Sequence, residues 1–462
     1  MYQTVQMLIS EKNYPEVFCF AQKNSVLAKN LYNAALFRIR QVFTGWDKQK
    51  RSENEEQVFE EIKATLKVYP TLSFKRVLTY HSLEKLMRVT VNPDFFAGLP
   101  MQTAQAIVRE AVSKFKEWLD SLKQYKKDPS GYTGKPKMPK YIKADKRTFV
   151  VTNQDAVLYP LEKEGYCALK LPGFDKNSRI QLAYVSSDSR LKQVSFTPYY
   201  GRYLMSFDIE YLVPAFYPDL PNAAGIDFGT DNIAAIACTD GSSVVYKGGA
   251  ILSENRLFAK RKAEAVSLIT QGHAHKHAES VFLSNLSARH ACFNKDQMHR
   301  ISMDIIRYCI DHRVGTLVLG VNKFWKQRSN MGKINNQKFV SIPHNQLRWM
   351  ISYKAMTAGI TVIEQEESYT SKADITAKDF IPVYGKETGR PVFSGRRVER
   401  GYYLCSLGYC INADCNGAAN ILRKAFPDIW DKVSDFRFLA MPETIRFHHL
   451  YKRTRKCCRL SA

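Results

Sequence analysis

Apolar residues recur at helical spacing through most of the first third of the chain. Between Phe18 and Gln41 they return every three or four positions, which predicts a long helix. A second long helix is expected to begin after Pro100 and to run towards Leu122, because proline is favoured at the first position of a helix. The opening residues, Tyr2 to Ser10, predict a strand. The first third is therefore expected to be mainly helical.

The segment from Lys123 to Arg147 has a different composition, with lysines and tyrosines interleaved among prolines. Because proline interrupts helices, the basic side chains are expected on an extended, irregular segment. Lysines beside aromatic residues suit contacts with phosphates and occasional base stacking. We predict nucleic-acid contacts at Lys135, Lys137 and Lys140, and a solvated linker is the alternative.

The pattern changes twice more along the chain. Between Phe149 and Leu212, apolar and polar residues alternate in short runs separated by turn-forming residues, which predicts a small antiparallel, barrel-like sheet. From Pro221 to about Ala425, apolar strands alternate with helices, as in an α/β domain.

Length and composition limit the number of domains, the location of the protein and the state of its cysteines. A chain of 462 residues is too long for one ordinary core, so two or three domains are expected. No apolar stretch approaches the roughly 18 residues of a membrane span, and the first residues show no signal-peptide pattern. We therefore expect a cytoplasmic protein without membrane association. Most of the ten cysteines are expected to be reduced and to act as small core residues.

Net charge is the strongest feature of the composition. The formal charge of +24 attracts polyanions, and nucleic acid is the usual polyanion of a cytoplasm. A soluble basic enzyme without a nucleic-acid partner is the alternative. None of these features predicts the oligomeric state.

One carboxylate lies in an apolar setting between Ala224 and Ala237, where the sequence predicts a strand, a tight turn and a second strand. Asp227 falls within the first of these strands, and a buried aspartate is costly unless it is paired or binds a cation. We therefore predict that Asp227 is a metal ligand. The alternative, for Asp227 and more so for Asp231, is a carboxylate satisfied by the backbone of a hairpin turn.

A second carboxylate, Asp414, precedes a run of small residues that predicts a helix packed closely against a sheet. Asn416 and Asn420 follow on one face of that helix at (i, i+4) spacing. Alone, Asp414 is also explained as a helix cap. Together with Asp227 it forms a pair of carboxylates in one α/β domain, as two-metal phosphodiester chemistry requires.

The sequence resembles the TnpB (OrfB) proteins, which insertion-sequence transposons encode and which are relatives of the type V CRISPR effectors. The resemblance covers nearly the whole chain. The segments that carry it are Asn30–Ala35 with Arg38 and Gln41, Gly134–Tyr141, Gly225–Asp227, Asp296–Ser302, Gly320–Lys323 with Trp325 and Lys326, Glu366–Lys372, and Asn412–Asp414 with Asn416. The last two are the more specific ones.

The resemblance implies RNA-guided cleavage of DNA by an RNase H-like (RuvC) nuclease domain. Its implied partners are a guide RNA made from the transposon end and double-stranded target DNA. The implied domain order is the first strand of a β-barrel-like domain at 1–15, a helical recognition domain with a basic linker at 16–145, the rest of the barrel-like domain at 146–220, the nuclease domain at 221–425, with a degenerate zinc-ribbon-like insertion at 370–411, and a basic tail at 426–462.

One departure from the family concerns the third carboxylate of the site. Most relatives carry a glutamate at the end of the strand that is Gly315–Leu319 here, but this chain has Gly320 at that position. Either the chain binds nucleic acid without cutting it, or the carboxylate has moved. In the RNase H-like sheet that the resemblance implies, the next strand, Ile360–Ile363, lies beside this one, about 4.8 Å away. It leads into Glu366 and Glu367, and strand parity does not choose between these two candidates.

A second departure concerns zinc. Relatives carry two Cys-x-x-Cys pairs before the last aspartate, a spacing typical of a structural zinc ribbon. Here Ala373 and Asp374 stand near the place of the first pair, and the second is reduced to Cys405, with Cys410 and Cys415 out of register. We therefore predict no structural zinc. Another possible ligand set consists of His448, His449, Cys457 and Cys458. We favour the interpretation of this segment as a basic tail over a zinc site.

The segment Asn322–Gln337 leaves the strand end nearest the predicted metal site. Its basic, amide and aromatic side chains fit contacts with a nucleic-acid backbone. We assign this role to Lys323, Trp325, Lys326 and Arg328. An equal alternative is that Trp325 packs into the core and the lysines are solvated.

Together these features predict a two-metal nuclease. Asp227 is expected to bridge two Mg²⁺ ions, with Asp414 on one ion and Glu366 or Glu367 on the other. The two alternatives are an RNA-guided DNA-binding protein that has lost cleavage and a nucleic-acid-binding accessory to transposition that uses no guide.

Overall fold

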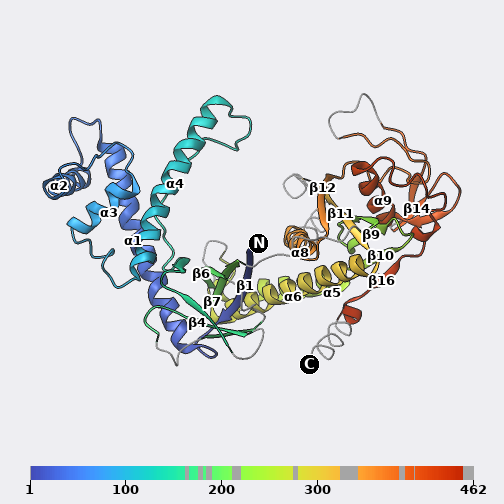
Figure 1. Cartoon of the computed structure of the whole chain (residues 1–462), viewed down its shortest axis with the longest axis horizontal. Coiled ribbons are helices and arrows are strands. Elements are labelled where there is room, and N and C mark those ends of the chain that lie inside the picture. The colour runs from blue at the N-terminus through green and yellow to red at the C-terminus, as the bar shows by residue number, and fades with distance from the viewer. Residues whose placement is uncertain are drawn as a thin grey trace. The chain divides into compact units, whose positions relative to one another are not determined.

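The computed structural model describes residues 2–161, 166–174, 180–183, 190–210, 220–273, 279–322, 342–383, 391–399 and 401–450. The chain divides into two compact units, Met1–Val213 and Pro214–Ala462. Each unit is described by itself, with the labels of Figure 1.

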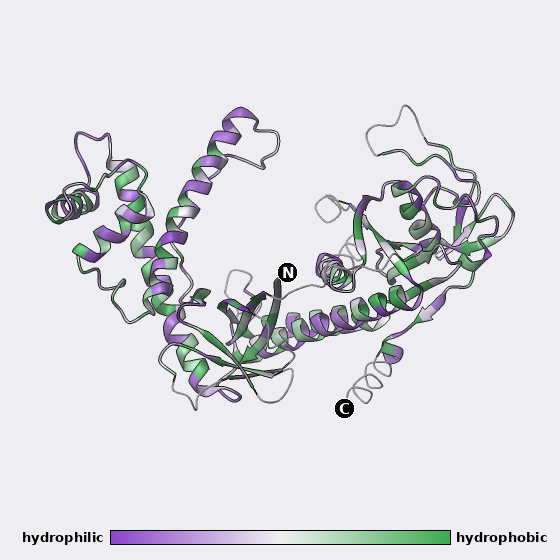
Figure 2. Cartoon of the chain, viewed as in Figure 1, coloured by the Kyte–Doolittle hydropathy of each residue, from purple (hydrophilic) through white to green (hydrophobic). Residues whose placement is uncertain are grey.

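Four helices dominate the first part of the N-terminal unit. They are α1 (Pro15–Gly45), α2 (Glu53–Val68), α3 (Tyr80–Val89) and α4 (Met101–Lys127). The predicted helices after residue 18 and after Pro100 are confirmed as α1 and α4. Hydrophilic and hydrophobic residues alternate along α4 (Figure 2), whose apolar side packs against α1.

The two shorter helices, α2 and α3, were not predicted. Each begins with a capping box, formed by Ser52 with Glu55 in α2 and by Thr79 with Ser82 in α3. The Ser52-x-x-Glu55 pair is a helix-start signal that the sequence already carries.

The N-terminal unit also contains two antiparallel sheets. One has the order β1-β7-β6-β2 and the other β3-β4-β5. Their strands are β1 (Tyr2–Ile9), β2 (Phe149–Thr152), β3 (Val157–Pro160), β4 (Tyr166–Lys170), β5 (Ile180–Ala183), β6 (Arg190–Tyr199) and β7 (Arg202–Glu210). The predicted strand at the start of the chain pairs with β7 along its length. No ladder joins the two sheets within the strands described, so a closed barrel stays a prediction.

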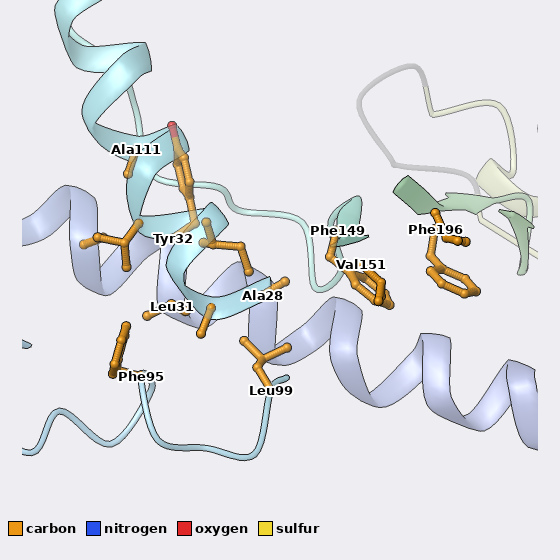
Figure 3. Close-up of a cluster of buried hydrophobic side chains, with 14 of the residues drawn as sticks. Ala28, Leu31, Tyr32, Phe95, Leu99, Ala111, Phe149, Val151 and Phe196 are labelled. Carbon is orange, nitrogen blue, oxygen red and sulfur yellow. The ribbon is translucent and has the colours of Figure 1, made fainter. Parts of the chain in front are cut away.

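One apolar core joins the helices and the larger sheet of this unit. Figure 3 shows Leu31 and Tyr32 of α1, Ala111 of α4, and Phe149 and Phe196 of the sheet, all of which are buried in this core. The rings of Phe149 and Phe196 stack with their centroids 5.0 Å apart. The helices and the sheet therefore fold as one body.

The C-terminal unit is built on a six-stranded mixed sheet with the order β12-β11-β8-β9-β10-β16. The strands are β8 (Asn222–Asp227), β9 (Asn232–Cys238), β10 (Ser243–Lys247), β11 (Val314–Val321), β12 (Thr361–Glu366) and β16 (Glu443–Ile445). β11 runs parallel to both β8 and β12, whereas β9 is antiparallel to β8. The predicted position of β12 beside β11 is confirmed.

The last of these strands corrects one expectation. We expected a basic tail from residue 426, but β16 pairs in parallel with β10 at the edge of the sheet. Trp430 is also fully buried, in the core on one face of the sheet. Residues 426–450 therefore belong to the folded unit, because they cover an edge and a face that would otherwise be exposed.

Helices cover both faces of this sheet. The principal ones are α5 (Gly249–Thr270), α6 (Val281–Asp311), α8 (His344–Thr357) and α9 (Ala413–Ala425). Residues of α6 and α8 share one core with the sheet, and residues of α9 share a second core with it. Since successive strand side chains point to opposite faces, β8 and β9 supply both cores and are almost entirely buried. The α/β organisation is therefore present.

Three further strands form a small antiparallel sheet ahead of α9. They are β13 (Arg396–Glu399), β14 (Tyr402–Leu404) and β15 (Cys410–Asn412), in that order, and the 3-10 helix η1 (Arg437–Leu439) follows α9. None of the helices that the structure describes combines the length and apolar character needed to cross a membrane.

Candidate active site

Asp227 is the last residue of β8, at the place where α9 approaches the strand most closely. A Cβ atom on Gly225 would lie only 2.2 Å from the carbonyl oxygen of Ala418, and one on Gly417 would lie 2.5 Å from Oδ2 of Asp227. Both positions therefore require glycine, the first for contact between helix and strand and the second for room beside the carboxylate. The sequence Gly225-x-Asp227 and the small residues of α9 are parts of one contact.

Asp414 is the second residue of α9, and Asn412 caps that helix in its place. The side-chain oxygen of Asn412 accepts hydrogen bonds from the backbone N–H groups of Asp414 and Cys415. The capping explanation for Asp414 is thus wrong, and its carboxylate is free for other contacts. Asn232 donates from Nδ2 to Asp414 Oδ2 over 2.6 Å, and Arg397 Nη2 lies 3.5 Å from Oδ1.

Glu367 follows directly after β12, beside the position where the family's usual glutamate is missing. Gly320 of β11 pairs with Gln365, and the backbone N–H of Glu367 donates to the carbonyl of Val321 over 3.3 Å. A Cβ atom on Gly320 would lie 2.7 Å from Glu367 Oε2. This oxygen is buried and has no hydrogen-bond partner among the described residues. The Glu367 carboxyl group therefore occupies the space that a side chain on residue 320 would need.

The neighbouring Glu366 has a different environment. Its Oε2 accepts from Lys424 over 2.7 Å, and its Oε1 accepts from both the backbone N–H and the hydroxyl of Ser368. Burial alone would raise the pKa of Glu366, but the hydrogen bonds from Lys424 and Ser368 outweigh it and lower the pKa. Of the two candidates, only Glu367 acts electrostatically on Asp227, whereas Glu366 is occupied by structural contacts.

The carboxylates of the site repel one another. Burial, together with the negative charges of Glu367 and Asp414, raises the pKa of Asp227 well above its ordinary value, and Arg397 only partly opposes this. Burial also raises the pKa of Glu367 to about 7. Among the described residues, no three acidic, histidine or cysteine side chains converge closely enough to form a ready-made metal cluster. The carboxyl groups of Asp227, Glu367 and Asp414 therefore interact electrostatically, but they do not converge on a single point.

The donor set nevertheless fits Mg²⁺. Carboxylate oxygens are the ligands that this ion prefers in proteins, and it keeps several of its own waters, so a loose arrangement of carboxylates suits it. A bound cation would give the buried, unpartnered oxygen of Glu367 a partner and would relieve the repulsion at Asp227. Asp227, Glu367 and Asp414 are the residues that fit this role.

Two polar residues near the carboxylates were not predicted from the sequence. Asn232 begins β9, is 6% exposed, and has a side-chain oxygen without a partner in the described part of the chain. Arg397 lies on the exposed strand β13. Asn232 is close to Asp227 in the sequence and so had a local signal. Arg397 had none, because only the folding of the small sheet brings it to Asp414.

The predicted basic segment lies in the N-terminal unit and is irregular, as expected. Its backbone is anchored to the helices: Trp118 Nε1 donates to the Pro136 carbonyl over 3.1 Å, and Arg40 donates to that of Pro139 over 3.3 Å. The side chains of Lys135, Lys137 and Lys140 are exposed. The second predicted contact segment, with Lys323, Trp325, Lys326 and Arg328, lies outside the described residues.

The cysteines of the zinc-ribbon-like region have separate environments. Cys405 is buried and its thiol donates to the Tyr409 carbonyl, Cys410 is exposed, and Cys415 is buried within α9. The carboxylate of Asp374 accepts from the backbone N–H of Ser406 over 2.6 Å. Of the alternative set in the tail, Cys457 and Cys458 lie outside the described residues. The absence of structural zinc stays a prediction.

Two family models match successive parts of the chain. Residues 213–325 match the OrfB_IS605 model, described as a probable transposase, and residues 344–421 match the model described as the Cas12f1-like TNB domain. The first match contains Asp227 and the second contains Glu367 and Asp414. The three carboxylates that the structure groups therefore fall within the matched segments.

Two curated proteins are similar over less than half of their own lengths. TnpB-like protein ORF457 of Acidianus two-tailed virus is 29% identical over 206 residues, 44% of this chain and 41% of that protein. The CRISPR-associated endodeoxyribonuclease Cas12f1 of Sulfoacidibacillus thermotolerans is 28% identical over 226 residues, 46% of this chain and 47% of that protein.

Solved structures give a weaker likeness. A Cas12f1–sgRNA–target DNA complex matches with a TM-score of 0.47 and 13% identity, covering 91% of this chain and 98% of that one. A CRISPR–Cas12f ternary complex matches with a TM-score of 0.31 and 14% identity, over 89% of this chain and 85% of that one. The sequence matches carry the comparison, and they support a relationship of residues 213–421 to the TnpB (OrfB) family and its Cas12f1 relatives.

Proposed function

We propose that this protein is a Mg²⁺-dependent DNA endonuclease with an RNase H-like site, directed to its target by an RNA guide. The observation that carries the proposal is the position of Glu367. Its carboxyl group enters the space beside Gly320 from the neighbouring strand, close enough to Asp227 for its charge to raise the pKa of that residue. The site thereby regains a third carboxylate that the sequence of β11 lacks.

Each carboxylate has a distinct role in the proposed site. Asp227 would hold both metal ions, Asp414 one of them and Glu367 the other. The chemistry that bound Mg²⁺ supplies here is activation of a water molecule and stabilisation of the leaving 3′-oxygen. Asn232 orients the Asp414 carboxylate through its hydrogen bond. Arg397 places a positive charge beside the carboxylates, where it can pair with an oxygen of the target phosphate.

We infer the substrate and the guide from the resemblance to the TnpB (OrfB) family and from the net charge. The relative from Sulfoacidibacillus thermotolerans is an endodeoxyribonuclease, and the family implies a guide RNA from the transposon end. A net charge of +24 suits two nucleic-acid partners. The exposed lysines of the segment around Lys137 would contact the phosphate backbone, and base pairing with the guide would select the sequence. A cytoplasmic location follows from these partners.

The competing function is RNA-guided DNA binding without cleavage, which the glycine at position 320 favours. Cleavage of a plasmid library by the purified protein with its co-purified RNA separates the two. We expect cleavage with Mg²⁺ and none with EDTA. Asp227→Asn should abolish it and Glu367→Gln should slow it strongly, whereas Glu364→Gln, a change at an exposed position of β12, should do neither.

Each outcome of this experiment has one meaning. Binding of the target without cleavage at any Mg²⁺ concentration supports the competing function. Absence of a discrete bound RNA contradicts both guided functions and leaves a guide-independent accessory to transposition. If Glu367→Gln cuts as well as the unchanged protein, the assignment of the third carboxylate is wrong.

A further inference from the structure

Three polar residues form a stripe along α9, the helix whose first turn carries Asp414. Asn416, Asn420 and Lys424 are spaced by four residues, so they lie above one another on one side of the helix. Both asparagines are fully buried, and the Lys424 side chain is only 8% exposed. Buried polar groups of this kind are costly unless they have specific partners.

Lys424 binds the two residues that flank Glu367. Its ammonium group donates to Glu366 Oε2 over 2.7 Å, to the Ser368 carbonyl over 3.0 Å and to the Pro382 carbonyl over 3.2 Å. An ammonium group has three N–H donors, and these three contacts use all of them. The peptide that carries Glu367 is therefore held on both sides by one side chain of α9.

The asparagines hold the chain that follows Glu367. Asn420 Nδ2 donates to the carbonyl groups of Thr370 and Ala373 over 3.0 and 2.7 Å, and Asn416 Nδ2 donates to Ala373 over 2.8 Å. Thr370 is linked to Glu367 in turn, because its hydroxyl and its N–H group donate to the Glu367 carbonyl over 2.8 and 3.3 Å. A continuous set of hydrogen bonds thus connects α9 to the backbone of Glu367.

Glu367 needs such support because it lies beyond the end of β12. Its N–H group makes the last contact with β11, after which the ladder of the sheet no longer fixes the chain. Its side-chain Oε2 also has no hydrogen-bond partner in the described structure, so no hydrogen bond to this oxygen holds the carboxyl group in place.

We propose that Asn416, Asn420 and Lys424 are positioning residues that set the distance from Glu367 to Asp227 and Asp414. α9 then carries one carboxylate of the site and fixes the location of another through the three residues of its polar stripe. This inference rests on the proposed function, since it assumes that Glu367 is a ligand of the metal.

The test is metal binding by full-length variants, measured as the loss of the free Mn²⁺ signal in electron paramagnetic resonance, beside the Mg²⁺ dependence of cleavage. Lys424→Met and Asn420→Leu should raise the Mn²⁺ dissociation constant roughly 10- to 100-fold, the usual effect of losing a residue that orients a ligand. The maximal cleavage rate at saturating Mg²⁺ should fall much less. Lys424→Arg, which keeps the charge, should recover part of the affinity.

Two comparisons separate positioning from a general structural effect. Lys378→Met removes an ion pair with Asp431 in the same unit, with 2.6 Å between charged atoms, and should leave Mn²⁺ affinity unchanged. Lys424→Met combined with Glu367→Gln should bind Mn²⁺ no more weakly than Glu367→Gln alone, because both changes act on the same ligand. If Lys424→Met does not fold, Glu366→Gln removes the same ion pair more mildly and should weaken binding several-fold.

The outcomes distinguish this inference from the function on which it rests. If Glu367→Gln weakens Mn²⁺ binding but Lys424→Met, Asn420→Leu and Glu366→Gln do not, the positioning role is overturned and the active site stands. If Asp227→Asn weakens binding and Glu367→Gln has no effect, Glu367 is not a ligand and both proposals about it are overturned. Additive losses in the Lys424→Met and Glu367→Gln double variant would also overturn the positioning role.

Discussion

Two glutamates, Glu55 in the N-terminal unit and Glu367 in the C-terminal unit, have opposite environments. At the junction of α1 and α2, Glu55 accepts hydrogen bonds from Lys48, Thr44 and the backbone N–H of Ser52, and these contacts lower its pKa to about 2. At the end of β12, burial raises the pKa of Glu367 to about 7, and its Oε2 has no hydrogen-bond partner in the described structure. The Glu55 carboxyl group thus ionises readily, whereas the surroundings of Glu367 disfavour its ionisation.

The difference separates a structural carboxylate from one that has the features of the proposed metal ligand. Contacts at Glu55 are complete within the protein, so its charge contributes to folding. Contacts at Glu367 are incomplete in the described structure, as expected if its partner is the metal ion of the proposed site. A buried acidic residue is therefore informative about function only when its hydrogen bonds are counted.

The largest expected effect is on catalysis at Glu367. We predict that Glu367→Gln lowers the rate of target cleavage roughly 10²- to 10³-fold, since a metal contact in the transition state contributes several kcal/mol. Unfolding by urea in EDTA should show no loss of stability, because the change removes a poorly solvated charge. A Glu367→Gln protein that is both active and less stable would contradict this prediction. Glu367 would then be a structural carboxylate, as Glu55 is.

The next effect concerns the space that Glu367 occupies. We predict that Gly320→Glu, which restores the usual acidic residue of the family, destabilises the protein by roughly 1–3 kcal/mol, because the new side chain meets Glu367 and Ile421. Cleavage should fall as well. Combining Gly320→Glu with Glu367→Gly should recover stability and part of the activity, as measured by urea unfolding and by plasmid cleavage. No recovery would mean that the two positions do not share one volume.

A comparable loss of stability is expected at Glu55, without any effect on metal binding. We predict that Glu55→Gln destabilises the protein by roughly 1–3 kcal/mol, because Lys48 and the backbone of Ser52 lose a charged acceptor. Mn²⁺ affinity should be unchanged. The neighbouring Glu56→Gln, at an exposed position, is the matched control and should have little effect in either measurement.

The smallest effect is a mirror-image dependence of stability on pH in EDTA. The folded pKa of Glu55 lies below the ordinary 4.5, so its stabilisation is complete above about pH 4.5 and is lost as the pH falls towards 2. The folded pKa of Glu367 lies above 4.5, so its contribution is lost as the pH rises from about 4.5 to 7. Urea unfolding of Glu55→Gln and Glu367→Gln against the unchanged protein should give slopes of opposite sign.

The sequence predicts some of these features better than others, and the reason is the range of the interaction involved. Helical spacing predicts α1 and α4, and the apolar strands locate Asp227 and the neighbouring β12, because all of these depend on local periodicity. Glu366 and Glu367 could not be separated, since strand alternation no longer applies beyond the last paired residue. The ion pair with Lys424, which lies 58 residues after Glu366, helps to assign Glu366 a structural role, and no local pattern encodes it.

The contacts of Arg397 and Asn420 illustrate the same limit. Each depends on the folding of a separate segment against α9 or its N-terminus, and no spacing in the chain encodes it. Asn420 was visible as one member of a regular pair with Asn416, but its partners on the chain after Glu367 were not.

The close approach of Gly320 and Glu367 also constrains how this family can change over generations. Because a side chain at position 320 and the Glu367 carboxyl group compete for one volume, a protein that carries the acid on β11 gains nothing from a second acid after β12. Transfer of the acid from one strand to the other must then pass through an ancestor with a weakened site or through two nearly simultaneous substitutions. Descendants should carry an acidic residue at one of the two positions and seldom at both.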